Sequence, residues 1–564
     1  MFRGPAGISA MMKEGAAHYK GTEEAVLRNV DAARKLYETV KSSYGPTGMC
    51  KLVNNYIEKR FLTADASTIL SELEVQHPAA RVLVMASQMQ NSEFGDHTNF
   101  VVILAAELLV QAGELISAGV HQSFIIKGYE LALARSLEVL KTRVCKTMHG
   151  CDDLMVRPLV ASKVFGRANV EVVTRLVKDA CNTVLLSEDG KMNTDNIRVS
   201  KIVGGTLTQS CVVNGMVFLR EPRTEAKEKR NCKIILLGTA LEGVQTEGTS
   251  TVLIEKAEHM KNFTQGEEEE MENLIKGYHD AGVEAVICGG AISSLALHFL
   301  NKYDMWALPV PSRFDIKRLS RTLRIPALQR RSAPMAEEIG LAEFVGLKEI
   351  GSQLVTVVQG KDTKVSTILL RGGAMTMLDE VARAVDDCVS LVSAVCRDDR
   401  FVAGAGNAEL ALSDDLEQYA TTLAGLEQYS VERFGVALAA FPKLLAENAG
   451  HNALETMSRL IARFKQTEQA GSKTEIVGVD VTSSNNSVRD ISEPCERDEF
   501  AAFNELGYPV YDHYLTKQWA IRLAADAALT LLRVDQIIMS KPAGGPKMPS
   551  QGHWDAADDR EPAF

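Results

Sequence analysis

The chain has 564 residues, of which 46% are hydrophobic and 24% charged, and its formal net charge is -11. This length exceeds what one hydrophobic core supports, so we expect about two to four domains. The acidic balance argues against a nucleic-acid-binding role, which normally needs a basic face. The 10 cysteines form no Cys-x-x-Cys pair, and Cys145, His149 and Cys151 lack the spacing of a closed zinc site. Without an apolar signal core at the N-terminus, we expect a cytoplasmic protein with reduced cysteines.

The first part of the chain is predicted to be helical. Apolar residues recur on one face across residues 23–42, with Thr22 as a candidate N-cap and Gly45-Pro46 as the stop. Further helices are predicted over residues 65–74, 78–90, 100–116 and 121–141. The helix at 100–116 is the most apolar, but carboxylates recur along it at helical spacing. We therefore predict a nearly buried helix of a soluble protein, not a membrane span.

The middle of the chain changes character. Short apolar runs at residues 233–238, 285–290, 306–310 and 366–370 are typical of strands, and helical or loop segments separate them. We predict that all four runs belong to one α/β module. From residue 375 the pattern is helical again, ending in an apolar helix over 519–534, and the tail after Lys541 is expected to be disordered.

Five short motifs combine glycines, aspartates and hydroxyl side chains. The most informative is Gly95-Asp96-His97-Thr98-Asn99, directly ahead of the apolar helix, where unpaired N–H groups and a carboxylate suit a phosphate and a metal ion. The others are Tyr44-Gly45-Pro46-Thr47-Gly48-Met49, Thr63-Ala64-Asp65-Ala66-Ser67-Thr68-Ile69, Ala384-Val385-Asp386-Asp387 and Val402-Ala403-Gly404-Ala405-Gly406-Asn407-Ala408-Glu409. In this order they resemble the nucleotide-site signatures of the group II chaperonins.

The resemblance runs from about residue 12 to residue 549. The strings at 74–80 and 533–547 are similar to one subunit type of the eukaryotic cytosolic chaperonin, called CCT or TRiC. The resemblance implies a multidomain fold with three domains. They are a mainly helical equatorial domain (1–152 and 402–564), a small α/β intermediate domain (153–221 and 370–401) and an inserted α/β apical domain (222–369) with a lid protrusion.

The resemblance also implies a function. Family members form a double ring of different but related subunits, which encloses unfolded proteins such as actin and tubulin and closes with ATP and Mg²⁺. The expected partners are therefore other ring subunits and unfolded proteins, with neither nucleic acid nor a membrane. The acidic string 266–272 would lie in the lid region, where a solvated helix face is an equally simple explanation, and substrate would contact helices near 315–322.

The site roles are carried over residue by residue. Asp65 and Asp387 match the aspartates that orient the attacking water, and Asp96 matches the magnesium ligand. The ATP-binding positions are Gly45, Pro46, Gly95, Asp96, His97, Thr98, Asn99, Lys163, Gly404, Ala405, Gly406, Gly478 and Asp512. Without the family context, Gly45-Pro46 would be a helix-ending turn, the aspartates helix caps or surface groups, and Lys163 an isolated surface lysine.

Three motifs depart from the family pattern. His97 replaces the glycine of Gly-Asp-Gly-Thr, Ala403 and Ala405 stand in the Val-Pro-Gly-Gly-Gly loop, and Cys50 follows Gly-Met. A histidine with positive φ would cost roughly 1 kcal/mol, and its ring could crowd the phosphates or attract them. Two functions therefore stay open, an ATP-hydrolysing foldase subunit and a structural subunit that binds nucleotide but barely hydrolyses it. A metabolite kinase is disfavoured, since no Gly-Lys-Ser/Thr string is present.

Overall fold

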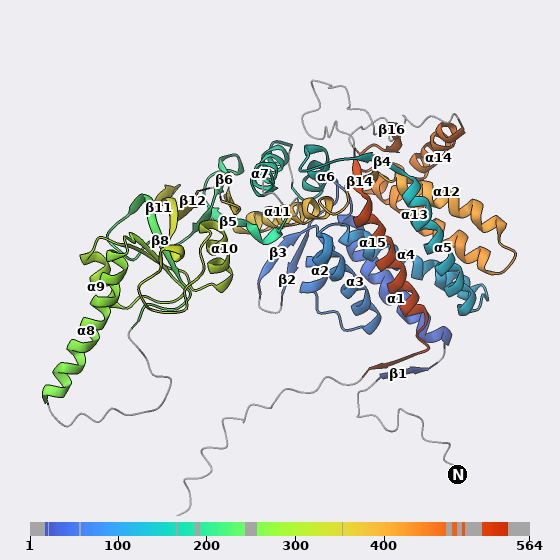
Figure 1. Cartoon of the computed structure of the whole chain (residues 1–564). Helices are drawn as coiled ribbons and strands as arrows, with labels where there is room; N and C mark the ends of the chain where they lie inside the picture. Colours follow the sequence, from blue (N-terminus) through green and yellow to red (C-terminus); the bar gives the residue numbers. More distant parts are fainter. Residues whose placement is uncertain are drawn as a thin grey trace, which may run out of the picture.

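The computed structural model shows three regions along an elongated molecule (Figure 1). A helical region lies at one end, a sheet region at the other, and the helix α11 (Met375–Val395) lies between them. The structure describes residues 17–20, 22–55, 58–164, 167–185, 192–242, 257–351, 353–361, 363–469, 476–481, 488–490 and 510–539.

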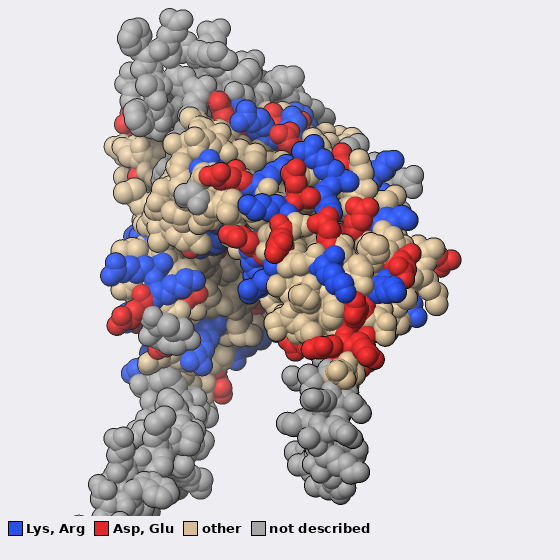
Figure 2. Space-filling model, turned by 90° about the vertical axis from the view of Figure 1, so that its left-hand side faces the viewer, with Lys and Arg blue, Asp and Glu red and all other residues tan. Residues whose placement is uncertain are grey.

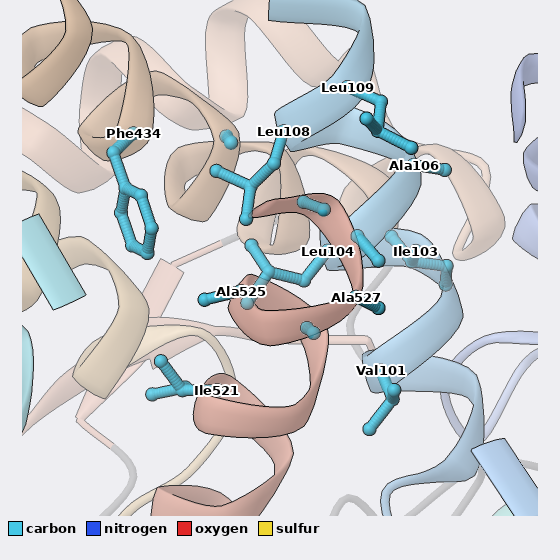
Figure 3. Packing of buried hydrophobic residues seen from close by; sticks show 14 of the residues in the cluster. Val101, Ile103, Leu104, Ala106, Leu108, Leu109, Phe434, Ile521, Ala525 and Ala527 are labelled. Carbon is cyan, nitrogen blue, oxygen red and sulfur yellow. The ribbon is translucent and has the colours of Figure 1, made fainter. Parts of the chain in front are cut away.

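The helical region is built from both ends of the chain around one core. The helix α4 (Thr98–Ser117) runs through its centre, and Val101, Leu104 and Leu108 are fully buried there. Figure 3 shows this helix packed against α15 (Tyr514–Leu532), with Phe434 of a third helix beside them. The other helices that contribute to this core are α1 (Thr22–Val40), α3 (Pro78–Phe94), α5 (Gln122–Thr142), α12 (Asn407–Thr422) and α13 (Glu427–Asn448).

The most apolar helix is a core helix, as its sequence predicted. By length and composition α4 could cross a membrane, but 72% of its most apolar stretch is buried inside the protein. Burying one such helix removes enough apolar surface to dominate the stability of the bundle around it. The two sequence halves of this region therefore fold as one unit.

Short strands and helices complete the helical region. The strand β1 (Ala17–Lys20) pairs with β18 (Gln536–Met539), so the two ends of the described chain lie side by side. A hairpin joins β2 (Lys51–Asn54) to β3 (Arg60–Thr63), and α2 (Ala66–Glu72) follows. The remaining elements are β4 (Val144–Thr147), β14 (Arg400–Ala403) and β17 (Tyr511–His513) in one sheet, β15 (Val477–Val479) and β16 (Val488–Asp490) in another, and α14 (Ala453–Gln469).

The sheet region holds a six-stranded sheet in the order β10-β9-β8-β11-β12-β7. One face packs on α10 (Arg313–Leu323), and the other packs on α8 (Ala257–Asp280) and α9 (Ser294–Lys302), so both faces are covered. Residues 243–256, which precede α8, lie outside the described residues. The strands are β7 (Met216–Phe218), β8 (Glu228–Leu237), β9 (Ala285–Cys288), β10 (Trp306–Pro309), β11 (Gly340–Ile350) and β12 (Gln353–Gly360).

One strand prediction was wrong in its grouping. The run at 366–370 does form a strand, β13 (Ser366–Gly372), but it does not join the six-stranded sheet. It pairs in parallel with β5 (Ile197–Val203) and antiparallel with β6 (Cys211–Asn214) in the middle region. The apolar run identifies a buried strand, but only the distant β5 supplies the matching parallel partner, and sequence periodicity does not reveal that pairing.

The middle region surrounds this small sheet with α6 (Asp153–Lys163), α7 (Arg167–Leu185) and α11. Its chain segments come from before and after the sheet region. The charged side chains on the side of the molecule shown in Figure 2 are intermingled, with Lys and Arg next to Asp and Glu. The face in that view therefore has no uniformly basic surface.

Candidate functional site

A cavity of about 230 Å³ lies where the helical and middle regions meet. The predicted residues that line it are Gly45, Pro46, Asp65, Asp96, His97, Thr98, Asn99, Lys163, Ala405, Gly406 and Asp512. The other predicted residues lie directly behind this lining. Asp387 pairs with Lys163, Gly95 and Gly404 abut Asp387 and Asp512, and Gly478 precedes the lining residue Val479. The structure therefore brings the complete predicted set to one place.

The start of α4 organises one end of the cavity. The Thr98 hydroxyl donates a hydrogen bond to Asp65 Oδ1 at 2.6 Å, and Asp65 Oδ2 accepts one from the backbone N–H of Thr68 at 2.9 Å. Asp65 is thus the cap of α2 and a cavity residue at once. Burial raises the pKa of Asp65, but Lys163 and the hydrogen bonds outweigh this, so the pKa lies below its ordinary value. The carboxylate stays ionised and fixed in orientation.

Asn99 ties three segments together behind the same end. Its amide nitrogen donates to the carbonyls of Ala64 at 3.0 Å and Ser43 at 3.2 Å, and its oxygen accepts from the N–H of Ala66 at 2.6 Å. The loop after Ser43 then turns at Gly45, where φ is +88° and a Cβ would come within 2.8 Å of Leu445. Only glycine fits this turn without strain.

An ion pair from the middle region closes the cavity. Lys163 at the end of α6 binds Asp387 of α11, and only 10% and 13% of their side chains are exposed. Burial lowers the pKa of Lys163, but Asp387 and Asp65 more than offset this and raise it. Burial raises the pKa of Asp387 to about 7 although Lys163 opposes the shift. Lys163 is a buried charge between carboxylates, so its interpretation as a surface lysine was wrong.

Gly95 lets α11 approach this closely. Its φ is +72°, and a Cβ there would lie 2.9 Å from Ser390 Cβ and 3.1 Å from the Cα of Asp387. A larger residue would push α11 away from the end of α3. The glycine therefore acts on helix packing, because it lets α11 and its Asp387 lie close to the helical region.

Asp96 and His97 form a second close side-chain contact inside the cavity. His97 caps α4 in the left-handed conformation, with φ 64° and ψ 21°, and its Nδ1 lies 2.9 Å from Asp96 Oδ2. Burial raises the pKa of Asp96, but His97 outweighs it and holds the pKa at about 2. Burial lowers the pKa of His97, and Asp96 more than compensates, so the pKa is raised. The histidine ring thus turns inward, toward the carboxylate.

The opposite end of the cavity contains a buried lysine that the sequence analysis missed. Lys517 is completely buried and donates to Asp512 Oδ2 at 2.6 Å and to Glu409 Oε1 at 2.8 Å. Burial lowers its pKa, but the two carboxylates overcome this and raise it. Glu409 lines the cavity, and its second carboxylate oxygen, Oε2, is buried without a hydrogen-bond partner. Lysine three residues after a helix start, ahead of an apolar run, is the signal that could have found this group.

The glycine-rich loop between these groups has two left-handed residues. Ala405 has φ 52° and Gly406 has φ 82° at the start of α12, where a Cβ on Gly406 would lie 2.8 Å from Pro442. The Ala405 carbonyl accepts from the N–H of Val479 at 3.0 Å, which fixes the loop to β15. Gly406 meets a strict steric demand, whereas Ala405 carries backbone strain of about 1 kcal/mol.

The sequence matches a known family over most of its length. Residues 36–542 match the model of the TCP-1/cpn60 chaperonin family. A protein named T-complex protein 1 subunit theta from Homo sapiens is 41% identical over 97% of both chains, and that from Bos taurus is 42% identical over the same shares. The Caenorhabditis elegans protein of that name is 41% identical over 98% of both. The chain therefore belongs to the TCP-1/cpn60 chaperonin family.

Proposed function

We propose that the chain is the theta-type subunit of a hetero-oligomeric, ATP-driven double-ring chaperonin that encloses and folds cytosolic proteins, with actin and tubulin as the substrates implied by the family. The family match along nearly the whole chain supports this proposal. In this assignment the helical region is equatorial, the middle region intermediate, and the sheet region apical. The apical region would carry the substrate contacts near α10 and the lid region at residues 266–272, within α8.

The observation that carries the nucleotide proposal is the cavity itself. This cavity of about 230 Å³ lies between the N-terminus of α4, the left-handed glycine loop and the buried Lys163. Together they provide N–H groups and positive charge for phosphates. At the other end, Asp512 and Glu409 offer oxygen acceptors, which suit ribose hydroxyls. The cavity therefore has one end for an anion and one for a donor-rich sugar.

The residues also fit one magnesium ion held largely by the nucleotide. Asp96 is the cavity carboxylate at the start of α4, and 26% of its side chain is exposed. Within the described ranges, no three His, Cys, Asp or Glu side chains gather into a protein-only metal site. Magnesium commonly binds through one or two carboxylates together with phosphate oxygens and water, where it neutralises phosphate charge.

The hydrolysis roles follow from charge and reach. Asp65 is fixed by Thr98 and Thr68, so it can hold a water molecule in one orientation. Asp387, with a pKa of about 7, can accept a proton from that water. Because Asp387 and Lys163 come from the middle region, closing this region onto the helical one would complete the site. Chemistry and ring closure would then be coupled.

The second candidate is a subunit that binds nucleotide but hydrolyses it poorly. The observation that favours it is the contact between His97 and Asp96, since the family has glycine at this position. Both candidates predict assembly and nucleotide binding. They differ in turnover at this one site.

Native size-exclusion chromatography of cell extract tests the assembly. We expect this 61.5 kDa chain to elute with other chaperonin subunits in a particle many times its own mass. Photolabelling that particle with 8-azido-ATP, followed by peptide mapping, tests the site. Label on peptides containing Gly404–Glu409 or Val477–Val479 supports the proposal, and elution of the bulk chain as a monomer or dimer would contradict it.

A further inference from the structure

The side chain of His97 is held in place on two sides. Its left-handed backbone turns the ring into the cavity, where only 12% of the side chain is exposed. On the other side the ring lies 5.8 Å from the ring of Phe100, which stacks on Phe441 at 4.1 Å with an interplanar angle of 14°. The two phenylalanines are fully or almost fully buried. The wall behind the histidine is therefore rigid.

The partner of His97 cannot move away either. The carbonyl of Asp96 accepts from Gln90 Nε2 at 3.0 Å, and the same nitrogen donates to the carbonyl of Thr516 at 3.2 Å. This bridge fastens the Asp96 backbone to α15. Because an ionised carboxylate only accepts hydrogen bonds, His97 Nδ1 must be the donor in the 2.9 Å contact. The neutral ring with a proton on Nδ1 and the charged ring both satisfy this contact.

A donor on this carboxylate competes with a metal ion. Magnesium binds oxygen at about 2.1 Å and keeps a nearly octahedral shell of water and phosphate oxygens. An N–H group on Asp96 Oδ2 removes one oxygen from use and places a positive dipole next to the other.

From this geometry, and resting on the proposed function, we propose that His97 is an internal counter-ligand of Asp96, which means that its ring occupies the carboxylate in place of a metal ion. Magnesium would then add little to the affinity of this subunit's site for nucleotide. The site would then hold nucleotide in a form poorly prepared for hydrolysis. His97 is a positioning residue in this role, because it acts through Asp96.

The test uses the intact particle, purified from cells in which this chain carries the variant. Photolabelling of this subunit by 8-azido-ATP is quantified with Mg²⁺ and with EDTA. The apparent affinity with Mg²⁺ divided by that with EDTA is called the magnesium gain. We expect the gain of the parent chain to be small. His97→Gly should raise it about tenfold, which corresponds to about 1.4 kcal/mol.

Two further variants separate the hydrogen bond from other effects. His97→Asn tolerates the left-handed backbone and places an N–H donor at the position of Nδ1, so it should keep the small gain. Asp96→Asn in the His97→Gly background should remove the added gain, because the carboxylate is lost. A gain in His97→Asn equal to that in His97→Gly would overturn the counter-ligand role.

The same experiment separates this inference from the proposed function. A parent chain whose labelling already depends strongly on Mg²⁺ would overturn the inference and leave the nucleotide site intact. If neighbouring subunits of the particle are labelled and this one is not, with or without Mg²⁺ and in every variant, both the inference and the nucleotide site fail.

Discussion

The two ends of the cavity are built in different ways. The end with Glu409, Asp512 and Lys517 lies wholly within the helical region, and its lysine is completely buried between two carboxylates. The other end combines Asp65 and Asp96 of the helical region with Lys163 and Asp387 of the middle region. One end is therefore fixed when the helical region folds, whereas the other depends on how two regions meet.

This difference separates binding from chemistry. A preformed acceptor pair holds a ligand at little conformational cost, because no segment has to move. An end assembled from two regions can be completed or broken by a movement between them. We therefore expect variants at the Lys517 end to alter stability and binding together, and variants at Asp387 to alter turnover.

The largest effect is expected at Lys517. Lys517→Met would leave Glu409 and Asp512 facing each other without a cation, and breaking a buried ion pair costs about 4 kcal/mol. Thermal unfolding and incorporation into the particle measure this. Lys127→Met, which removes an exposed lysine from its pair with Glu427, is the matched control and should change the unfolding free energy far less. Equal losses of stability in the two variants would show that the buried contacts of Lys517 stabilise the protein no more than an exposed ion pair does.

Asp387→Ala tests the other end. Nucleotide binding should persist, while hydrolysis at this subunit should fall about 100-fold because the group acts on the attacking water. Asp386→Ala is the control, since the neighbouring residue is exposed, whereas Asp387 pairs with the cavity residue Lys163. Single-turnover hydrolysis with the other ring sites disabled measures both. Parallel loss of binding and turnover would assign Asp387 a structural role.

A smaller effect is expected at Asn99. Asn99→Ala leaves the carbonyls of Ser43 and Ala64 and the N–H of Ala66 without their partner, at a cost of about 2 kcal/mol. Nucleotide affinity should fall with stability, because the Gly45 loop loses its anchor. Asn301→Ala removes one exposed bond, to the N–H of Glu225, and should leave nucleotide affinity unchanged. Unchanged affinity in Asn99→Ala would contradict the anchoring role.

The smallest effect concerns the strain at Ala405. Ala405→Gly relieves a left-handed alanine but adds freedom to the unfolded chain, so we expect a gain of about 0.5 kcal/mol in unfolding free energy. Ala408→Gly, three residues later inside α12, should instead lose about 1 kcal/mol. Chemical denaturation of the two variants compares them. A loss in both would mean that Ala405 is not strained.

The sequence predicted the helices well, and the residues that its motifs grouped lie together around one cavity. The predicted helix at 100–116 is α4 (Thr98–Ser117), and that at 121–141 is α5 (Gln122–Thr142), because their apolar spacing is regular over several turns. The strand β13 was placed in the wrong sheet, because strand partners are distant in the chain. The site residues came from ordered motifs, which carry information that spacing alone does not.

The residues missed at the site are those that act through other residues. Lys517, and its contact with Glu409 of the fifth motif, became visible only when β17, α12 and α15 were placed around one cavity. The direction in which the His97 ring turns was also open, because it depends on a backbone angle and on the wall formed by Phe100 and Phe441. Sequence patterns report which chemistry is present, whereas contacts across elements decide how it is arranged.

The proposed nucleotide site is tested most directly by a high-resolution map of the assembled particle with a non-hydrolysable ATP analogue. We predict density for the nucleotide in this subunit's cavity, with phosphates near Thr98 and Lys163 and ribose near Asp512. An empty cavity in this subunit, while the analogue occupies its ring neighbours, would contradict the proposal that this cavity binds nucleotide.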